Sequence, residues 1–376
     1  MKLNHTLTAL LLLLFSLTVK AADTDVILPE KGVADPDGKI VWYDGKLLPL
    51  FGKGWQDTAS YYDRLPAKAK EIVRPPVWSL SRDSSGMYVR FHTNAKSVKV
   101  RWRLTKKNLS MGHMPATGVS GIDLYTKNAA GKWQYIWNFA GKPRGVTNTA
   151  TLSAPAMTHE FMLYLPLYNG VRSLEIGIDK NKSLMLPTLA ASEKQKPIVV
   201  YGTSITQGAC ASRPGMSATA MIGRRFGMPV INLGFSGNGR MDSELAPLFA
   251  ELDTSLYILD NLWNMPLARV KEHAEPFIRD LHQRRPQVPI LLVEDMSYLG
   301  IHPTAKGKVL YAIFNKLVAE GIKNIYFLSN EGMLGDDSDG TVDGLHPNDL
   351  GLRRQADVFI AKLSDLIKQE KLQILP

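Results

Sequence analysis

Three residues in the C-terminal half of the chain have the types and spacing needed for acyl transfer. Ser204 follows an apolar run, and Asp343 precedes His346 by three residues. A serine hydroxyl is a weak nucleophile unless a base within hydrogen-bond reach accepts its proton. His346 is the candidate base, and Asp343 would orient the imidazole and stabilise its protonated form. The sequence therefore predicts Ser204, Asp343 and His346 as the catalytic residues of an acyl-transfer site.

The oxyanion of a tetrahedral intermediate needs hydrogen-bond donors that are already in place. The candidates are the backbone N–H groups of Ser204 and Gly237 and the side-chain amide of Asn264. Glycine at position 237 lets the backbone approach a substrate closely, because it has no Cβ atom. Asn238 and Asn261 are rival amide donors, and Asn264 could instead be an ordinary turn residue.

The same residues also have structural interpretations. Ser204 could cap the helix that follows it, and His346 could be a loop histidine beside a turn formed by Asp343. Asp339 is a second choice for the acid, since seven residues separate it from His346. Cys210 could be a catalytic thiol, but a buried structural cysteine is the favoured interpretation. The presence of all these candidate residues in one sequence favours the catalytic interpretation.

The elements that must position these residues alternate between strand and helix after position 190. Short apolar runs predict strands at 197–201, 228–233, 255–259, 288–294 and 324–328, and helical stretches lie at 217–226, 243–252, 267–285, 304–320 and 347–371. This alternation predicts an open five-stranded parallel sheet covered on both faces. Sites in such sheets form at the carboxyl ends of the strands. Ser204, Gly237 and Asn264 each follow a different strand, and His346 precedes the last helix.

The part of the chain before position 190 has a different pattern. Runs rich in Val, Ile, Tyr, Phe and Trp lie at 87–92, 97–104, 121–126, 133–139, 159–165 and 173–178, and Gly, Asn, Asp and Pro separate them. Such spacing predicts an antiparallel β-sandwich. The predicted organisation is an N-terminal β-sandwich, jelly-roll-like, at 22–189 and an α/β/α catalytic domain at 190–376.

Two further residues are candidates for substrate binding. His113 lies in a small-residue loop, 112–118, which either leans over the crevice or is a plain surface connection. Arg213 either holds a substrate oxygen or forms a surface salt bridge. Six tryptophans could stack on sugars, although packing within the sandwich accounts for most of them: Trp42, Trp55, Trp78, Trp102, Trp133 and Trp137.

Composition excludes several classes of protein. The chain has 376 residues, 45% of them hydrophobic and 21% charged, which excludes a disordered tail protein, a collagen-like fibre and a multi-span membrane protein. A single cysteine excludes a disulfide scaffold and a cysteine-based zinc site. The eight histidines are scattered without a His-x-x-x-His pair, and the acyl-transfer chemistry needs no metal or cofactor.

The net charge of +10 raises the question of nucleic acid. The densest basic group, Lys99 to Lys107, alternates at its start with Val98, Val100, Trp102 and Leu104. That alternation is typical of the wet face of a half-buried strand. We therefore expect an acylated carbohydrate or other small ester as the partner and no nucleic acid, and the sequence leaves the oligomeric state open.

The N-terminus has the features of a secretory signal peptide over residues 1–21. Lys2 precedes an apolar run of about 13 residues, which is short for a membrane span of about 20. Cleavage after Ala21 would leave 43 Lys and Arg against 35 Asp and Glu, a net charge of +8. We expect export to a periplasm or to the outside of the cell, with no stable membrane span after cleavage.

The short sequence motifs around the candidate catalytic and oxyanion residues resemble those of the SGNH hydrolases, also called the GDSL esterase family. The matching residues are Ser204, Gly237, Asn264, Asp343 and His346. The resemblance covers the chain from about position 196 onward. Two blocks depart from the family pattern: position 203 is Thr where Asp is usual, and Leu-Trp-Asn-Met at 262–265 stands where Gly-x-Asn-Asp is usual. The β-domain followed by Gly-Thr-Ser-Ile-Thr-Gln-Gly resembles a bacterial two-domain subgroup, several members of which act on acetylated carbohydrates.

The resemblance implies a serine esterase that removes small acyl groups, foremost acetyl, from carbohydrate. Two alternatives stay open. One is a lysophospholipase- or thioesterase-type acylhydrolase of the same fold. The other is a non-catalytic carbohydrate-binding protein on an esterase scaffold, for which Thr203 and the altered third block are the best support.

Overall fold

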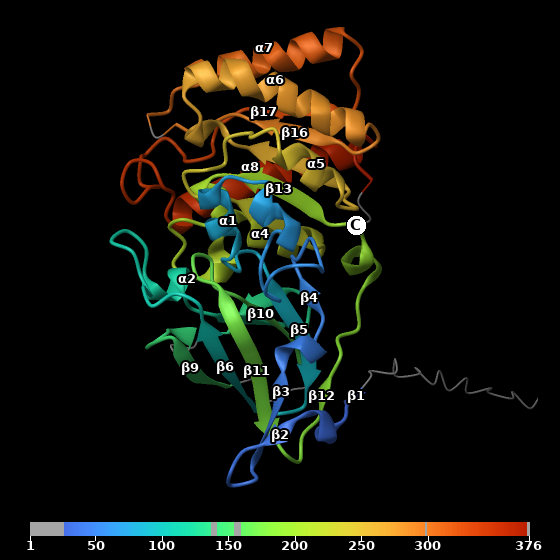
Figure 1. Cartoon of the computed structure of the whole chain (residues 1–376), viewed down its shortest axis with the longest axis vertical. Helices are drawn as coiled ribbons and strands as arrows, with labels where there is room; N and C mark the ends of the chain where they lie inside the picture. The colour runs from blue at the N-terminus through green and yellow to red at the C-terminus, as the bar shows by residue number, and fades with distance from the viewer. Residues whose placement is uncertain (1–25, 137–140, 154–158, 298, 374–376) are drawn as a thin grey trace, which may run out of the picture.

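The computed structural model describes residues 26–136, 141–153, 159–297 and 299–373. Figure 1 shows antiparallel strands in one half of the molecule and a parallel sheet flanked by helices in the other. The predicted signal peptide lies outside the described residues. Within the described ranges, no helix is both long and apolar enough to cross a membrane.

The N-terminal half is built from two antiparallel sheets. One has the order β1-β12-β5-β10-β7-β8 with β4 also paired to β5, and the other has the order β2-β3-β11-β6-β9. The strands are β1 (Val26–Ile27), β2 (Val33–Ala34), β3 (Ile40–Asp44), β4 (Leu50–Phe51), β5 (Tyr88–Thr93), β6 (Ser97–Leu104), β7 (Asp123–Lys127), β8 (Trp133–Tyr135), β9 (Thr147–Ser153), β10 (His159–Tyr164), β11 (Val171–Asp179) and β12 (Leu184–Met185). Inward-facing side chains of both sheets form one core, as in a β-sandwich.

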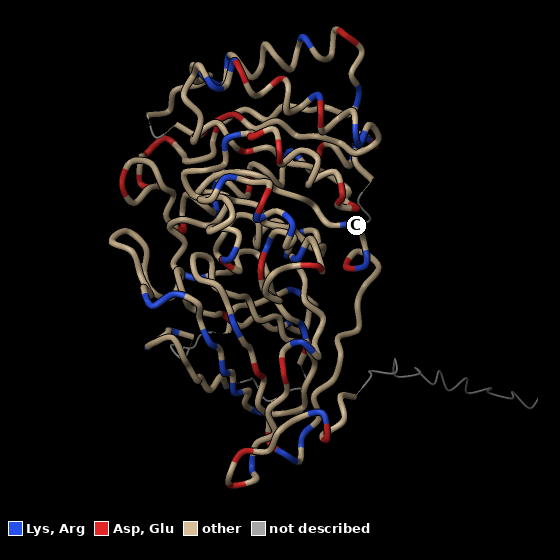
Figure 2. The backbone as a smooth tube through the Cα atoms, viewed as in Figure 1, with Lys and Arg blue, Asp and Glu red and all other residues tan. Residues whose placement is uncertain are grey.

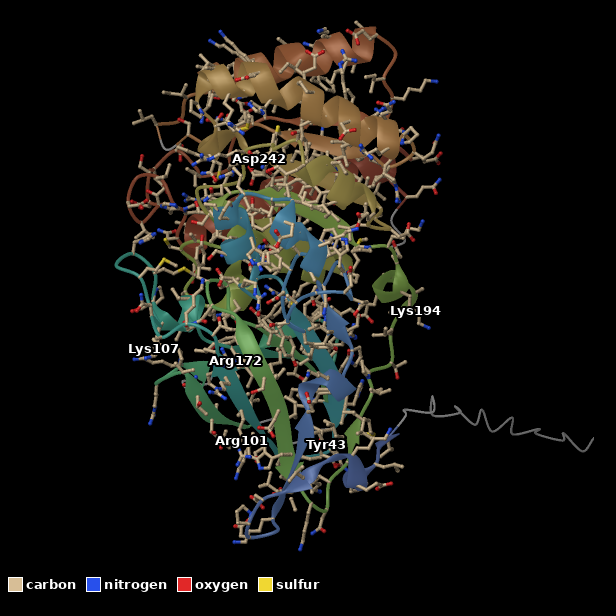
Figure 3. The ribbon with its side chains drawn as sticks, in the orientation of Figure 1. Tyr43, Arg101, Lys107, Arg172, Lys194 and Asp242 are labelled. Atoms are coloured by element: carbon tan, nitrogen blue, oxygen red, sulfur yellow. The ribbon has the colours of Figure 1, made fainter. Side chains whose placement is uncertain are left out.

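Strand β6 shows how alternation in the sequence becomes two faces of a sheet. Val98, Val100 and Trp102 are buried in the sandwich core. The intervening basic side chains face outward, and the Arg101 guanidinium lies 3.6 Å from the centroid of the Trp42 ring (Figure 3). Figure 2 shows Lys and Arg interspersed with Asp and Glu along the chain. The basic run of β6 is thus the wet face of a half-buried strand.

The C-terminal half contains a five-stranded parallel sheet of order β14-β13-β15-β16-β17. Its strands are β13 (Ile198–Gly202), β14 (Val230–Gly234), β15 (Leu256–Asp260), β16 (Ile290–Val293) and β17 (Ile325–Leu328). Every residue of the strands β13, β14, β15 and β16 is buried, as expected for apolar runs that are covered on both faces. The predicted α/β/α domain preceded by a β-sandwich is confirmed.

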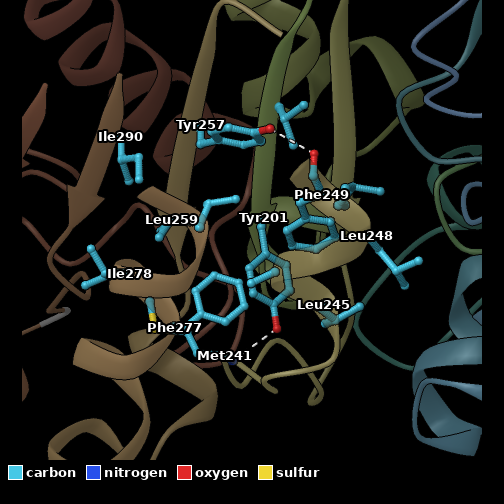
Figure 4. Close-up of a cluster of buried hydrophobic side chains, with 14 of the residues drawn as sticks. Tyr201, Met241, Leu245, Leu248, Phe249, Tyr257, Leu259, Phe277, Ile278 and Ile290 are labelled. Carbon is cyan, nitrogen blue, oxygen red and sulfur yellow. Dashed lines mark hydrogen bonds between the residues drawn. The ribbon is translucent and has the colours of Figure 1, made fainter. Parts of the chain in front are cut away.

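Helices cover both faces of this sheet (Figure 1). The helices of the C-terminal half are α3 (Ser204–Gln207), α4 (Ala218–Phe226), α5 (Leu245–Ala250), α6 (Leu267–Arg284), α7 (Ala305–Ala319) and α8 (Asp349–Lys368). Helices α5, α6 and α7 share one core with the sheet, and α4 and α8 share the core on the other face. Figure 4 shows the first core, where Tyr201 packs against Phe249 and Phe277 and its hydroxyl accepts a hydrogen bond from Met241 N–H.

A segment of the N-terminal half lies in the core of the parallel sheet. Two short helices, α1 (Pro75–Ser81) and α2 (Ala116–Val119), complete the α-helices of the chain that the structure describes. Val77 of α1, with Trp55 and Leu65, belongs to the core under α5 and α6. The buried Arg64 guanidinium donates to the Gly234 carbonyl at 2.6 Å. The sequence patterns predict no element over 52–86, because the apolar residues there follow neither a period of 2 nor one of 3.6.

An ion pair in the same region ties the N-terminal half to the loop after β14. Asp242, labelled in Figure 3, accepts from Arg74 at 2.8 Å and from Arg269 at 2.7 Å. Arg74 also donates to the Asn238 side-chain oxygen at 2.8 Å. The segment at 52–86 therefore braces the loop that carries Gly237.

Candidate active site

The nucleophile candidate sits at a tight turn from strand to helix. Strand β13 ends at Gly202, and the Thr203 hydroxyl caps α3 by accepting from Ile205 N–H at 3.3 Å. Ser204 is thus the first residue of α3 and not its cap. A Cβ atom at Gly202 would lie 2.0 Å from the Thr206 hydroxyl, so this position needs glycine. Thr203 thus supplies the N-cap of α3.

The structure brings Ser204, His346 and Asp343 into one hydrogen-bonded chain. Ser204 Oγ lies 3.1 Å from His346 Nε2, and His346 Nδ1 lies 2.8 Å from Asp343 Oδ2. An ionised carboxylate only accepts hydrogen bonds, so Nδ1 carries the proton of the neutral imidazole. Nε2 then accepts from the serine hydroxyl. This is the geometry in which a histidine can remove the serine proton.

A local turn fixes the carboxylate. Asp343 Oδ1 accepts from the backbone N–H groups of His346 at 2.7 Å and Leu345 at 3.0 Å. Partial burial acts to raise the pKa of Asp343, but these hydrogen bonds and the one from the imidazole outweigh it and lower the pKa to about 2. Asp343 is therefore ionised across the physiological range. Asp339, the rival acid, is exposed, and its carbonyl accepts from Asn348.

The loop that carries Gly237 contacts the nucleophile turn, since Ser236 N–H donates to Gln207 at 3.1 Å and a Cβ atom at Gly239 would lie 2.0 Å from the Gly202 carbonyl oxygen. Gly237 lies in the loop after β14 with φ of 67°, a left-handed conformation that suits glycine. The Asn264 side-chain oxygen accepts from Gly239 N–H at 3.2 Å, which fixes the amide plane and leaves its NH₂ group available as a donor. Among the described residues, the N–H groups of Ser204 and Gly237 have no acceptor at hydrogen-bond distance.

The rival amides are placed differently. The Asn238 oxygen accepts from Arg74 and its NH₂ group donates to the Ser236 carbonyl at 2.9 Å. Asn261 is fully buried. Of the three asparagines, only Asn264 is therefore both partly exposed and, among the described residues, without a hydrogen-bond acceptor for its NH₂ group.

Buried polar residues that the sequence analysis did not single out support this arrangement. Gln207 accepts from Ser236 N–H at 3.1 Å and donates to Asp83 at 3.2 Å and to the Leu167 carbonyl at 3.1 Å. The Tyr168 hydroxyl donates to the Ser204 carbonyl at 2.9 Å. Gln207 belongs to the nucleophile block and could have been suspected, whereas Asp83 and Tyr168 have no sequence signal.

The loop at 112–118 lies against the site. The His113 and His346 ring centroids are 5.2 Å apart. A groove of about 790 Å³ is lined mainly by this loop, including His113, with Lys142 and Val342 on its other side, and none of the three triad residues is among its lining residues. The β-sandwich thus forms one wall of the space beside the Ser–His–Asp chain.

Arg213 has a different environment. Its guanidinium pairs with the buried Asp123 carboxylate at 2.7 Å, hydrogen-bonds to Tyr125 and stacks 3.7 Å from the centroid of the Tyr135 ring. Gly215 N–H also donates to Asp123 at 3.1 Å. These contacts direct Arg213 into the β-sandwich, and its substrate-binding role stays a prediction.

Two other chemical groups lie near the triad residues. His113, Asp343 and His346 offer ligand atoms within 4.8 Å of one another, so a metal ion bound there would withdraw the two triad members from their hydrogen-bond chain. Burial and the nearby Asp343 charge raise the pKa of the Cys210 thiol to about 12. A neutral, buried thiol is a poor nucleophile, which favours the structural interpretation of Cys210.

Asp260, at the end of β15, makes stability depend on pH. Burial and the nearby Asp295 charge raise its pKa to about 6, against the effect of the Thr206 hydroxyl, which donates at 3.0 Å. The folded-state pKa of Asp260 is above its unfolded value, so the protonated side chain makes its full contribution to stability below about pH 4. That contribution is lost as the pH rises through 6. We expect Asp260→Asn to remove a cost of up to about 3 kcal/mol at pH 8 but not at pH 4.

Urea unfolding of wild type and Asp260→Asn at pH 4, 6 and 8 measures this effect. Asp57→Asn, at an exposed carboxylate, is the matched control. The expected result is a stability difference that grows between pH 4 and pH 8 for Asp260→Asn alone. Parallel stability curves for wild type and Asp260→Asn would contradict the assignment.

The fold and site define the class of protein: an SGNH-type α/β/α domain with a β-sandwich before it. Family models match residues 195–364 as the GDSL-like lipase/acylhydrolase family and residues 40–184 as the N-terminus of an SGNH-hydrolase-type esterase. The crystal structure of a protein from Bacteroides ovatus described as a GDSL-like lipase is 32% identical, covers 90% of this chain and 100% of its own, and has a TM-score of 0.80. The chain therefore belongs to the GDSL-like lipase/acylhydrolase family of SGNH esterases.

More distant solved structures share the fold. A salicylyl-acyltransferase, SsfX3, is 18% identical, with 89% of this chain and 97% of that one covered and a TM-score of 0.65. A family two carbohydrate esterase from Cellvibrio japonicus is 14% identical, with coverages of 93% and 97% and a TM-score of 0.54. None of the curated proteins matches the chain significantly.

Proposed function

We propose that the chain is an exported serine esterase that removes small acyl groups, foremost acetyl, from a carbohydrate. The observation that carries this proposal is the chain of hydrogen bonds from Ser204 through His346 to Asp343. The oxyanion candidates beside it supply the second requirement of acyl transfer. Two observations support a carbohydrate as the substrate. The β-sandwich forms one wall of the groove beside the triad, and the fold is shared with a family two carbohydrate esterase.

The proposed reaction follows from the positions of these groups. His346 Nε2 takes the Ser204 proton as the serine oxygen attacks the ester carbonyl. The resulting oxyanion accepts from Ser204 N–H, Gly237 N–H and the Asn264 amide, while Asp343 stabilises the imidazolium. The imidazolium gives its proton to the sugar oxygen as the C–O bond breaks. Water, deprotonated by His346, then attacks the acyl-serine and releases the carboxylic acid and free Ser204.

Acetate release tests the substrate class. The purified protein is incubated with acetylated xylan, xyloglucan, pectin and peptidoglycan, and kcat/KM is measured on acetyl and octanoyl nitrophenyl esters. The proposal expects acetate from at least one polysaccharide and a higher kcat/KM for acetyl. A marked rise in kcat/KM with acyl length, without acetate release from any of the polymers, would contradict deacetylation.

Removing the Asn264 amide tests the oxyanion assignment. We expect Asn264→Ala to lower kcat about 10²- to 10³-fold with a small change in KM, because the donor acts on charge that develops only in the transition state. Asn181→Ala, at an exposed asparagine, is the control. The assignment is wrong if steady-state kinetics show equal kcat for the two variants.

A further inference from the structure

A second pocket, which shares no lining residue with the groove beside His113, opens where the two halves of the chain meet. It has a volume of about 890 Å³ and lies between the β7–β8 hairpin, the end of α4 and one side of α8. Its basic side chains are Lys127, Lys132, Arg224, Arg225 and Arg353, and its acidic one is Glu193. The volume is in the range of pockets that hold small organic ligands.

Three of these five cations have no ion-pair partner among the residues that the structure describes, whereas Lys127 pairs with Glu160 at 2.8 Å and Arg353 with Asp357 at 2.8 Å. Glu193 is committed to the buried Arg90 at 2.8 Å and to Lys127 at 3.7 Å. Arg224 donates only to neutral groups, the Gly215 carbonyl at 2.7 Å and a tyrosine hydroxyl at 3.2 Å. In the part of the chain that the structure describes, neither Lys132 nor Arg225 has an ion-pair partner.

Cations gathered in a partly enclosed space repel one another, and a bound anion relieves that repulsion. Guanidinium groups suit carboxylates and phosphates in particular, because their planar forks can bind two oxygens at once. The charge of the pocket thus indicates an anionic ligand.

The surroundings favour carboxylates spread along a sugar chain over a compact phosphate. Arg224 and Arg225 lie in the last turn of α4, where the helix dipole presents partial negative charge to a ligand. That field opposes a concentrated dianion more than it opposes separated single charges. The half-buried Trp133 ring adds an apolar surface at the wall of the pocket.

The pocket lies along the two helices that begin beside the nucleophile turn. Ser217, which caps α4, is a close neighbour of Gly208, and Asp349, the first residue of α8, accepts from Ser212 N–H at 2.9 Å. At 1.5 Å per residue, Arg224 is about 10 Å along α4 from Ser217. The end of α4 that lines the pocket is thus about two helical turns from the cap that contacts the nucleophile turn.

We propose that this pocket is a binding subsite for the carboxylates of an acidic glycan. The step that places its acyl group at Ser204 rests on the proposed esterase function, but glycan binding itself does not. In this arrangement, Lys132, Arg224 and Arg225 bind uronate carboxylates and Trp133 packs against a sugar face. The polymer is thereby held while another of its residues occupies the groove beside His113.

Binding is tested on the full chain carrying Ser204→Ala, so that no turnover occurs. Calorimetry measures the affinity for unsubstituted polygalacturonate, neutral arabinoxylan and a single-stranded oligonucleotide. Lys132→Ala with Arg225→Ala removes two pocket charges. Lys271→Ala with Arg172→Ala removes the same charge from exposed sites on α6 and β11, where Figure 3 labels Arg172.

We expect polygalacturonate to bind more tightly than arabinoxylan, and the pocket variant to weaken that binding about tenfold while the control changes it less than twofold. Added salt should weaken polygalacturonate binding more in the protein with the unsubstituted pocket than in the pocket variant. Equal losses in both double variants, or equal affinity for the neutral polymer, would overturn the proposal. The proposal would also be overturned if the oligonucleotide bound as tightly as polygalacturonate and its binding likewise depended on Lys132 and Arg225.

A second measurement separates this inference from the esterase function. With Ser204 present, kcat/KM on acetylated polygalacturonate is divided by kcat/KM on nitrophenyl acetate for each variant. The subsite predicts that this ratio falls in the pocket variant only, and an unchanged ratio contradicts it. If neither ester is hydrolysed, the esterase proposal fails, whereas the binding measurement still decides the subsite.

Discussion

Ser204→Ala should lower kcat on nitrophenyl acetate at least about 10⁴-fold, the largest effect expected from a single substitution in this chain. The reason is that Ser204 Oγ is the group at 3.1 Å from His346 Nε2 and would form the acyl-enzyme. The side chain is nearly buried at 7% exposure, and alanine removes one oxygen without adding volume. The fold should therefore persist.

The control for this variant is Ser364→Ala, which removes a hydroxyl from a half-buried position on α8. Its kcat should stay within about twofold of wild type, because ordinary surface substitutions have small effects. Circular dichroism and thermal unfolding check that both variants are folded. A folded Ser204→Ala protein with wild-type kcat would remove Ser204 from the mechanism.

Asp343→Asn should lower kcat about 10⁴-fold at neutral pH, the second large effect. An amide at this position donates to Nδ1 of the imidazole as readily as it accepts, so the histidine loses the preference for the tautomer that leaves Nε2 free. The substitution also removes the negative charge of the Asp343 carboxylate, which stabilises the imidazolium. The pKa of about 2 for Asp343 means that acid titration of this carboxylate limits activity only at very low pH.

Asp339→Asn provides the matched control in the same loop. The exposed Asp339 contacts Asn348 through its backbone carbonyl, which the substitution leaves in place. We expect its kcat to remain within a few-fold of wild type. Comparable losses in Asp339→Asn and Asp343→Asn would show that the loop conformation, and not the Asp343 charge, controls the reaction.

Much of the fold could be predicted because the elements obey simple periodicities. The predicted strands at 197–201, 228–233 and 255–259 agree with β13, β14 and β15 within two residues at each end. The helix predicted at 267–285 ends one residue earlier, at Arg284. Strands β3 and β9 were not predicted. In β9, Thr147–Ser153, threonine, serine and asparagine replace the apolar residues that mark a strand.

The candidate site was predictable in part, because its members follow successive strands whose carboxyl ends share one edge. The spacing of three residues between Asp343 and His346 was enough to predict their contact. Contacts between the two halves of the chain carry no such signal. The approach of His113 to His346 depends on how the β-sandwich docks, and Arg213 binds Asp123 across 90 residues of sequence.

The insertion of Trp55, Leu65 and Val77 under α5 and α6 illustrates the same limit. Their burial depends on the surface that the parallel sheet offers, and not on any local period. Arg64 would be expected at the surface by residue type, yet it is fully buried because backbone carbonyls of β14 accept its hydrogen bonds. Such residues are found only once the two halves are seen together.

Covalent labelling with a fluorophosphonate tests the central claim most directly, because the reagent reports an activated serine without any assumption about the substrate. Intact-mass and peptide analysis of the wild-type chain should show one adduct, located on Ser204. Labelling should be lost in Ser204→Ala and strongly slowed in His346→Ala. A folded wild-type protein that stays unlabelled, or one labelled at another serine, would contradict the account.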